Sequence, residues 1–239
     1  MLRRRSAAPA GSARPARRDG FSMRPKLVIF DCDGVLVDTE TLANHRLSAL
    51  LTEAGFAASY EYCRKNFCGR SLVSVHAEVE AAGTMLGPDF VERWYRELPD
   101  LFAGGVQAIP HVEDVIRTLK TESIDACVAS SARVDKMHMT LGQTGLLPYF
   151  QDVLFSATMV ARGKPFPDLF LHAAERMGVA AADCIVVEDS VAGTKAGIAA
   201  GMRVFSYHGD PHSDVDGLAE AGGILFDDMR QLPGLVPLR

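Results

Sequence analysis

The 239-residue sequence has no long hydrophobic run and no closely paired cysteines. No stretch approaches 18 consecutive apolar residues, which argues against a membrane-spanning helix, and no apolar signal-peptide segment follows the basic start. The five cysteines, at positions 32, 63, 68, 127 and 184, are scattered and complete neither a CxxC motif nor a zinc site. We therefore expect a cytoplasmic protein with reduced thiols and no membrane partner.

A strongly basic composition is also missing. The net charge of −5 argues against nucleic acid as the main partner. Apolar residues make up 48% and charged residues 23% of the chain, which is enough to bury a substantial core. The length corresponds to roughly one and a half typical domains, so we expect one large domain or one domain with an insert.

The basic charge is concentrated at the start of the chain. Residues 1–24 hold seven arginines and one acid, Asp19, and are rich in Ala, Ser, Gly and Pro. Such a composition cannot bury enough surface to fold, so residues 1–22 are predicted to be a disordered extension outside the catalytic fold. Three interpretations remain open: a transit peptide, a solvated tail, or upstream sequence read through a wrong start. The position of Met23, just before the first strand, favours the third.

Short apolar strands alternate with helical segments through most of the remaining chain. This alternation predicts an α/β fold, a Rossmann-like doubly wound parallel sheet with helices on both faces. Asp168 and Ser190 are expected to cap the N-termini of two of the helices. The predicted strands span residues 26–30, 124–129, 150–156, 184–187, 203–206 and 224–226, and the predicted helices span 111–120, 133–142, 168–178 and 191–200.

One region interrupts the alternation. Between residues 38 and 108 no convincing strand is found, and four segments with helical spacing are separated by glycines. We therefore expect a helical domain at 38–108, inserted into a core domain made of 23–37 and 109–239. Its predicted helices span 40–54, 59–67, 71–82 and 88–103.

Two aspartates, Asp31 and Asp33, directly follow the first strand in the stretch FDCDGVLVDTE. Side chains two residues apart on an extended chain point to the same side, so both carboxylates can face one cleft. Ligands of open parallel sheets bind beyond the carboxyl ends of the strands, where this pair lies. A calcium-binding loop is excluded because its sixth position is Leu36 and its twelfth is Leu42. A plain turn explains one aspartate but not two.

A second pair of acids, Glu188 and Asp189, ends the strand CIVV. If this strand lies beside the first, four carboxylates converge, and a hard divalent cation such as Mg²⁺ is best suited to neutralise them. The alternative is that Asp189 or Ser190 only caps the following helix, but capping does not call for Glu188 as well.

Two hydroxyls and a lysine follow other strands. Ser130 and Ser131 end the second strand in VASSAR, where a helix N-cap is the alternative interpretation. Lys164 lies in RGKPFPD, between prolines 165 and 167, which stiffen the backbone around it. A lone loop lysine is usually solvated, whereas a lysine beside four acids has a reason to be held in place.

These motifs together resemble the haloacid dehalogenase superfamily. DCDGVLVDTE matches its first motif, VASS its hydroxyl motif, GKPFPD its lysine motif and VVEDSVAG its acidic motif, in order over residues 26–206. The helical insert resembles the four-helix cap of the branch that contains beta-phosphoglucomutase and many sugar-phosphate phosphatases. The C-terminal half resembles bacterial phosphatases that act on sugar phosphates such as 6-phosphogluconate.

The resemblance implies a Mg²⁺-dependent phosphatase of a small sugar or sugar-acid phosphate. Asp31 would be the nucleophile that forms an aspartyl-phosphate, and Asp33 the general acid and base. Ser130, Ser131 and Lys164 would bind the phosphoryl oxygens. The metal ligands would be Asp31, the Asp33 carbonyl, Asp189 and, directly or through water, Glu188. The expected partner is a small phosphorylated metabolite, and the expected assembly is a monomer or weak homodimer.

Residues of the cap would contact the substrate. Arg70, beside Gly69 between two predicted helices, is the main candidate, and Lys65 and His76 are weaker ones because charged helix residues mostly face solvent. A dehalogenase is disfavoured because true haloacid dehalogenases lack an aspartate at the position of Asp33. Phosphonate hydrolases of the superfamily use a cap lysine, a role that only Lys65 leaves open.

Two alternative functions remain. The mutase branch carries a histidine and an arginine in its cap, at positions that correspond here to Ala43 and Leu72, and this weakens the mutase interpretation. A non-catalytic binding module would be credible if a motif residue were missing, but all are present. A nucleotide-binding P-loop is excluded because GTK at 193–195 has the wrong order.

Overall fold

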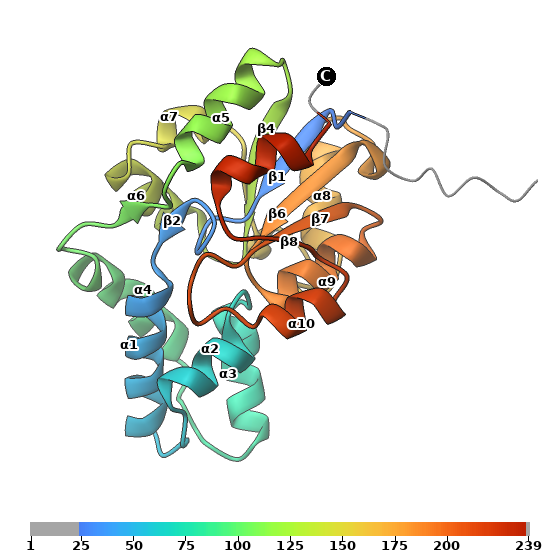
Figure 1. The fold of residues 1–239 in the computed structure, drawn as a ribbon. Helices are drawn as coiled ribbons and strands as arrows, with labels where there is room; N and C mark the ends of the chain where they lie inside the picture. Colours follow the sequence, from blue (N-terminus) through green and yellow to red (C-terminus); the bar gives the residue numbers. More distant parts are fainter. Residues whose placement is uncertain (1–23, 238–239) are drawn as a thin grey trace, which may run out of the picture.

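A parallel six-stranded sheet forms the centre of the computed structural model, which describes residues 24–237 (Figure 1). The spatial order of the strands is β5-β4-β1-β6-β7-β8. The predicted extension at 1–22 lies outside the described residues. The strands are β1 Leu27–Phe30, β4 Asp125–Ser130, β5 Leu154–Ser156, β6 Cys184–Glu188, β7 Arg203–Tyr207 and β8 Ile224–Phe226.

Helices cover both faces of the sheet, as the predicted doubly wound fold requires (Figure 1). α8 and α9 pack on one face, and α5, α6, α7 and α11 pack on the other. α10 lies against β8 and α9. The bounds of these helices are α5 Val112–Thr121, α6 Val134–Gln143, α7 Leu147–Phe150, α8 Asp168–Arg176, α9 Val191–Ala199, α10 Val215–Glu220 and α11 Leu232–Leu235.

Strand β1 lies in the middle of the sheet, with β4 on one side and β6 on the other. All four of its residues are buried. Leu27 and Ile29 enter the hydrophobic cluster on the α8 and α9 side, and Val28 and Phe30 enter the cluster on the opposite side. A strand buried on both faces needs a continuous apolar run, which is why LVIF does not alternate with polar residues.

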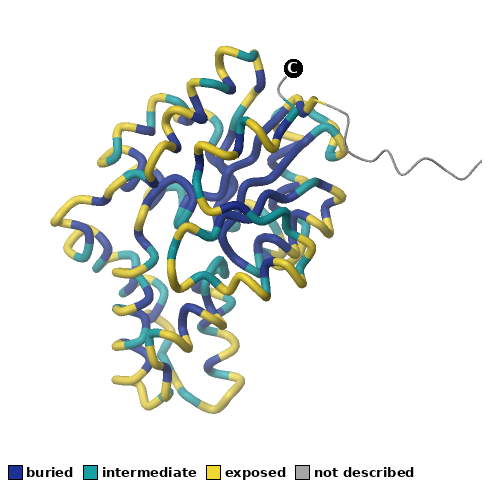
Figure 2. Tube along the Cα trace, in the orientation of Figure 1, coloured by how far each residue is buried: buried dark blue, intermediate teal, exposed yellow. Residues whose placement is uncertain are grey.

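The helical insert hangs from one end of the sheet (Figure 1). Its apolar residues and one face of the sheet belong to a single buried cluster, visible as dark blue segments in Figure 2. A two-stranded antiparallel ribbon, β2 Val37–Asp38 with β3 Gln107–Ala108, joins the chain segments that enter and leave it. The four expected helices are confirmed as α1 Glu40–Glu53, α2 Tyr60–Phe67, α3 Leu72–Ala81 and α4 Phe90–Leu101.

Two local expectations need correction and a third is confirmed. The strand expected at 150–156 begins only at Leu154, because the preceding LPYF forms the short helix α7 with a proline in its first turn. Asp168 is the first residue of α8 and not its N-cap, and its carboxylate instead pairs with Arg162 at 2.7 Å. The expected cap at Ser190 is confirmed, since its hydroxyl accepts a hydrogen bond from the Gly193 amide.

The five cysteines are all free thiols, four of them buried and Cys68 partly exposed. Within residues 24–237, every helix is too short or too polar to cross a membrane.

A pair of helical glycines tests how tightly α9 packs on the sheet. A Cβ at Gly197 would lie 2.5 Å from Val204 Cγ2, whereas the nearest atom to a Cβ at exposed Gly142 lies 4.0 Å away. We expect Gly142→Ala in α6 to stabilise the protein by roughly 0.5–1 kcal/mol through helix propensity. Gly197→Ala should destabilise it by about 1–3 kcal/mol through overpacking. Urea unfolding of both variants measures this contrast, and stabilisation by both would contradict the close packing of α9.

Candidate active site

The carboxyl ends of β4, β1 and β6 bring the predicted site residues together. Asp31 directly follows β1, and its amide donates a hydrogen bond to the Val187 carbonyl of β6 at 2.9 Å. Ser130 is the last residue of β4 and Glu188 the last of β6. Because these strands are neighbours and parallel, residues far apart in the sequence meet at one edge of the sheet.

Lys164 is the centre of this group. Its Nζ lies 2.6 Å from Asp31 Oδ1 and 2.5 Å from Glu188 Oε1, and all three side chains are almost completely buried. The ammonium also lies 5.0 Å from the ring centroid of Phe170 in α8. A buried ammonium between two carboxylates stabilises both of them and fixes their positions.

The second oxygen of Glu188 organises the turn into α9. Glu188 Oε2 accepts hydrogen bonds from the Asp189 and Ser190 amides, both at 2.9 Å, and from the Ser190 hydroxyl at 2.8 Å. A Cβ at Gly193 would lie 1.7 Å from Glu188 Oε1, so a side chain there would displace this carboxylate. Both oxygens of Glu188 are therefore already engaged by groups of the protein.

Asp189 packs against the loop that follows β1. Oxygens of Asp31, Glu188 and Asp189 all lie within 4.8 Å of one another. Gly34, in that loop, has a positive φ of 77°, and a Cβ there would lie 2.1 Å from Asp189 Oδ2. Glycine is thus required both by the backbone conformation and by the approach of this carboxylate.

Burial and crowding shape the electrostatics of these acids. Burial raises the pKa of Asp31 to about 8; Lys164 opposes this shift, whereas Glu188 and Asp33 add to it. Burial, followed by the charges of Glu40, Glu188 and Asp31, also raises the pKa of Asp189 well above its usual range. Burial disfavours the charge on Lys164, but Asp31 and Glu188 outweigh it and raise the pKa of the ammonium. The site holds more negative charge than Lys164 can compensate.

Asp33 faces a different basic residue. Lys136 Nζ in α6 lies 2.7 Å from Asp33 Oδ1, and the Thr39 hydroxyl donates to the same oxygen at 2.5 Å. Burial disfavours the charge on Lys136, but Asp33 outweighs it and raises the pKa of this lysine. The two aspartates of the opening motif thus have separate partners: Lys164 holds Asp31 and Lys136 holds Asp33.

A small cavity of about 90 Å³ joins both aspartates to the insert. Asp31, Asp33 and Ser130 line it from the core, so the expectation that both carboxylates face one cleft is confirmed. Trp94 and Tyr95 of α4 line it from the insert. The other lining residues include Ala43, Asn44, Leu47, Phe67, Leu72 and Lys136.

The two predicted phosphate-binding serines have different contacts. The Ser130 hydroxyl is buried and accepts a hydrogen bond from the Ala132 amide at 3.1 Å. The Ser131 hydroxyl donates to the Gly69 carbonyl of the insert at 2.8 Å. Ser131 therefore links core and insert in this arrangement, while Ser130 stays at the edge of the sheet beside Asp31.

The three cap candidates differ in whether they line a cavity near the site. Arg70 lines the small cavity and also a larger neighbouring cleft, and it pairs with Glu78 at 2.6 Å. Lys65 is exposed and lines the larger cleft. His76 lies beside Glu80 and Phe90 and lines neither of these two cavities. Its side chain is only 18% exposed, so His76 packs within the insert and does not face solvent as a charged helix residue would.

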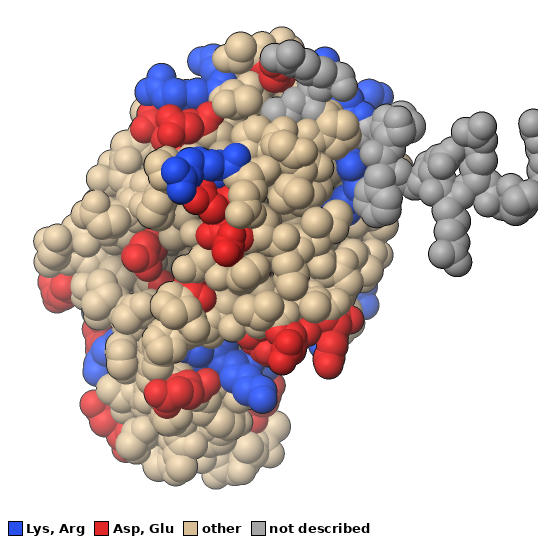
Figure 3. All heavy atoms as spheres, viewed as in Figure 1, with Lys and Arg blue, Asp and Glu red and all other residues tan. Residues whose placement is uncertain are grey.

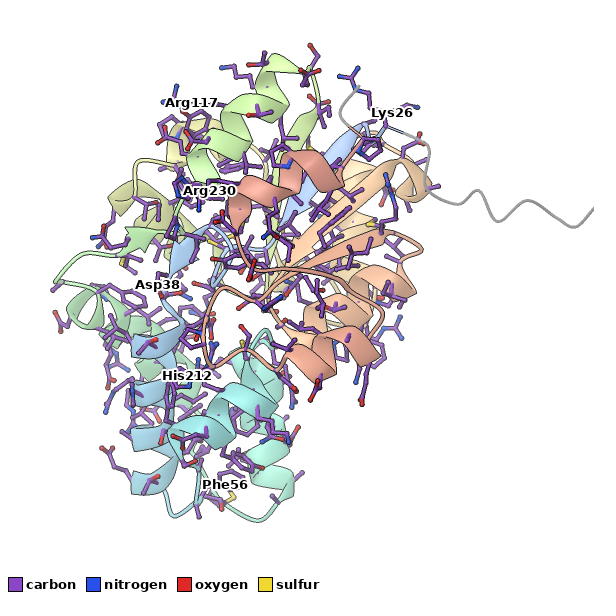
Figure 4. The ribbon with its side chains drawn as sticks, viewed as in Figure 1. Lys26, Asp38, Phe56, Arg117, His212 and Arg230 are labelled. Carbon is purple, nitrogen blue, oxygen red and sulfur yellow. The ribbon has the colours of Figure 1, made fainter. Side chains whose placement is uncertain are left out.

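Charged and aromatic contacts hold the insert against the core. Buried Arg64 of α2 pairs with Glu40 of α1 at 2.8 Å and with Asp210 of the core at 2.7 Å. Tyr60 of α2 meets His212 edge to face, with ring centroids 5.4 Å apart. Figure 4 labels His212 where the loop after β7 passes over the insert. These contacts fasten α2 of the insert to the loop after β7.

Comparisons with known proteins agree with this geometry. The family model described as haloacid dehalogenase-like hydrolase matches residues 25–201. The chain belongs to this family. The 6-phosphogluconate phosphatase of Escherichia coli strain K12 is 36% identical to this chain over 214 residues. The match covers 89% of this chain and 95% of that protein. The family resemblance predicted from the motifs is confirmed.

Solved structures of the same family have the same fold. A conserved haloacid dehalogenase-like protein of unknown function from Agrobacterium tumefaciens strain C58 superposes with a TM-score of 0.72 at 35% identity, covering 88% of this chain and 96% of that one. A haloacid dehalogenase family hydrolase from Deinococcus radiodurans R1 was solved with bound phosphate and sodium. It superposes with a TM-score of 0.66 at 27% identity, and the match covers 90% of this chain and 98% of that one.

Sequence reasoning missed several residues of this site. Lys136 lies inside an ordinary amphipathic helix, and nothing in its spacing marks it as the partner of Asp33. Glu40 ends the first motif, but its pairing with Arg64 depends on how α1 and α2 pack. Asp210 follows β7 in a segment without a motif. Only Glu40 carried a sequence signal, through its place in DCDGVLVDTE.

The raised pKa of Asp31 has a consequence for stability. Between the usual aspartate pKa of about 3.9 and the folded value of about 8, the folded protein holds a proton that the unfolded chain has released. The free energy of unfolding of the wild type therefore falls as the pH rises through this range. Asp31→Asn removes this proton uptake. As the pH rises through this range, the free energy of unfolding of the variant relative to that of the wild type should therefore grow by up to about 1.4 kcal/mol per pH unit.

Urea unfolding in EDTA, from about pH 5 to about pH 8, measures this difference. Asp152→Asn, which removes a charge from an exposed turn, is the matched control and should show little change with pH. A constant difference between Asp31→Asn and wild type over this range would contradict the burial argument.

Proposed function

We propose that this protein is a Mg²⁺-dependent phosphatase of a small sugar or sugar-acid phosphate, with Asp31 as the nucleophile. The observation that carries the proposal is the buried Asp31 carboxylate, fixed by Lys164 at the end of the central strand with Asp189 close by. The named activity of the Escherichia coli relative and the family of the chain support the same reaction class.

The residues around Asp31 suit a hard divalent cation. The group offers carboxylate oxygens only, which Mg²⁺ prefers, and burial together with the neighbouring acids raises the pKa values of Asp31 and Asp189. We propose Asp31, Asp189 and the Asp33 carbonyl as its ligands. Glu188, whose two oxygens are engaged by Lys164 and by the turn into α9, would act on the metal only through water. When bound, the cation would lower the repulsion between the carboxylate and an anionic phosphate.

In the first step, an Asp31 oxygen attacks phosphorus and the bond from phosphorus to the leaving oxygen breaks. The leaving oxygen takes the proton of a protonated Asp33 carboxyl and departs as an alcohol. Lys136 and Thr39 both contact Oδ1 of Asp33, and within the described chain Oδ2 has no hydrogen-bond partner, so Oδ2 is the oxygen available to carry this proton.

In the second step, Asp33 takes a proton from water while the water oxygen attacks phosphorus. The bond between Asp31 and phosphorus breaks, which regenerates the Asp31 carboxylate and releases inorganic phosphate. Lys164 and the Ser130 hydroxyl would bind the phosphoryl oxygens as charge moves during both steps. Trp94, Tyr95 and the other insert residues of the small cavity would limit the access of water.

The mutase remains the second candidate on the same fold. Ala43 and Leu72, where the resemblance places the mutase's histidine and arginine, both line the small cavity. Neither side chain can bind a phosphate or transfer a proton. This favours hydrolysis over transfer to a second sugar hydroxyl.

Phosphate release tests the proposed reaction. With Mg²⁺, the wild type should hydrolyse at least some compounds of a panel of sugar phosphates, sugar-acid phosphates, nucleotides and phosphonoacetaldehyde. EDTA should abolish turnover, and Asp31→Asn should lower kcat by at least about 10³-fold because the nucleophile is lost.

Three other outcomes would contradict the proposal. Undiminished hydrolysis in EDTA would argue against a metal-dependent site. Conversion of beta-glucose 1-phosphate to glucose 6-phosphate without phosphate release would identify a mutase. Silence of folded protein in both assays would favour a binding module.

Lys136→Met tests the partner of Asp33. Loss of the ammonium leaves Asp33 without its ion pair, so the carboxyl is no longer held toward the leaving group. We expect kcat to fall at least about tenfold, within the range that a general acid contributes. Lys120→Met, on the exposed side of α5, is the matched control and should leave kcat unchanged. Equal kcat values for the two variants would show that Lys136 has no role in the reaction.

A further inference from the structure

A second, larger cleft opens between the insert and the core beside the candidate active site. Its volume is about 630 Å³, which suits a small organic ligand. One wall comes from α2, α3 and the loop between them, and the other from residues 161–166, α9 and residues 212–214. Lys164 and Asp189 of the active site also line it, so the cleft adjoins the active site.

Basic residues are concentrated in this cleft. Residues 24–237 contain 18 lysines and arginines against 29 aspartates and glutamates. A third of those basic residues line the cleft, but only two of those acids do, Asp189 and Asp214. Figure 3 shows basic side chains gathered over α2, where the insert meets the core. The six basic residues are Arg64, Lys65, Arg70, Arg162, Lys164 and Lys195.

Three of these side chains are tied to core or insert acids. Arg64 pairs with Glu40 and Asp210, and Lys164 belongs to the active site. Arg162 makes two hydrogen bonds to Asp168. These contacts leave Arg64, Arg162 and Lys164 little freedom to bind a further anion.

The remaining basic residues are available to a ligand. Within the described chain, neither Lys65 nor Lys195 has an ion pair, and they face the cleft from opposite walls, α2 and α9. Arg70 pairs with Glu78, whose side chain is 48% exposed, so this pair is weak and can exchange for a ligand. Val73 and Phe166, exposed by 62% and 47%, offer apolar contacts in the same cleft.

We propose that Lys65, Lys195 and Arg70 form a subsite for a second anionic group, carried by the substrate at the end opposite its phosphate. The inference rests on the proposed phosphatase function for the position of the phosphate. Two lysines on opposite walls of a partly enclosed cleft would attract an anion between them, and Arg70 adds a planar donor pair suited to carboxylate or phosphate oxygens. The cleft would thus select doubly anionic substrates over neutral sugar phosphates.

A matched pair of ligands tests the subsite. 6-Phosphogluconate and glucitol 6-phosphate have the same six-carbon chain and phosphate, but one ends in a carboxylate and the other in a hydroxymethyl group. Titration calorimetry with Mg²⁺ on the Asp31→Asn protein measures their dissociation constants without turnover. We expect the carboxylate ligand to bind at least about tenfold more tightly, as charge-assisted contacts imply. Glucitol 1,6-bisphosphate tests whether a second phosphate serves better than a carboxylate.

Substitution of the two lysines should remove this preference. In the Asp31→Asn background, Lys65→Met with Lys195→Met should weaken 6-phosphogluconate binding about fivefold or more and change glucitol 6-phosphate binding less than about twofold. Lys120→Met with Arg176→Met removes the same charge from two exposed positions outside the cleft, and this control should leave the preference intact.

The outcomes distinguish a failure of the proposed subsite from a failure of the proposed phosphatase reaction. Equal binding of the two ligands by the parent protein, or equal weakening of both by the lysine substitutions, would overturn the subsite even if the wild type hydrolyses phosphate esters. A preference that the lysine substitutions remove would support the subsite even if the wild type hydrolyses nothing, in which case the phosphatase proposal alone fails.

Discussion

The ion pairs of Lys164 with Asp31 and Glu188 are the interaction on which the rest of the site depends. They connect three elements, the end of β1, the loop after β5 and the end of β6. Removing the ammonium would leave two buried carboxylates without a cationic partner, at a large cost in free energy. Glu188 extends the connection to α9, because its second oxygen holds the turn whose Ser190 caps that helix. The same contacts therefore position the proposed nucleophile and stabilise the fold.

The arrangement of charges explains why Asp31 and Asp33 are suited to different roles. Asp31 lies with Glu188 and Asp189 in a group that holds excess negative charge, and burial raises its pKa. Asp33, two residues later, is held by Lys136 and Thr39 on the side of the small cavity. A carboxylate crowded by acids is suited to share a cation, whereas Asp33 is fixed by a lysine and a threonine where it lines the small cavity.

The helical insert adds a second wall to the open sheet edge, which creates the small cavity and the larger basic cleft. Gly69 approaches so closely that a Cβ there would lie 1.9 Å from Ser190 Oγ, and its carbonyl accepts a hydrogen bond from Ser131. The loop that contains Gly69 thus touches the core between the small cavity and the basic cleft. Arg64, paired with Asp210 across the boundary, holds this arrangement from α2. Substrate selection therefore depends on residues of both parts of the chain.

Local sequence patterns determined most of the fold. The apolar runs predicted the central strands, helical spacing predicted the four helices of the insert, and the acids after two strands predicted a common edge because parallel strands end together. Short elements such as α7 and the β2–β3 ribbon escaped prediction because a few residues carry no periodic signal. The partners of the charged residues were decided by tertiary structure alone. Lys136 beside Asp33, Arg64 beside Asp210, and Lys65 opposite Lys195 come from elements far apart in the sequence. No local pattern records such pairs, because they arise only when the insert packs on the core.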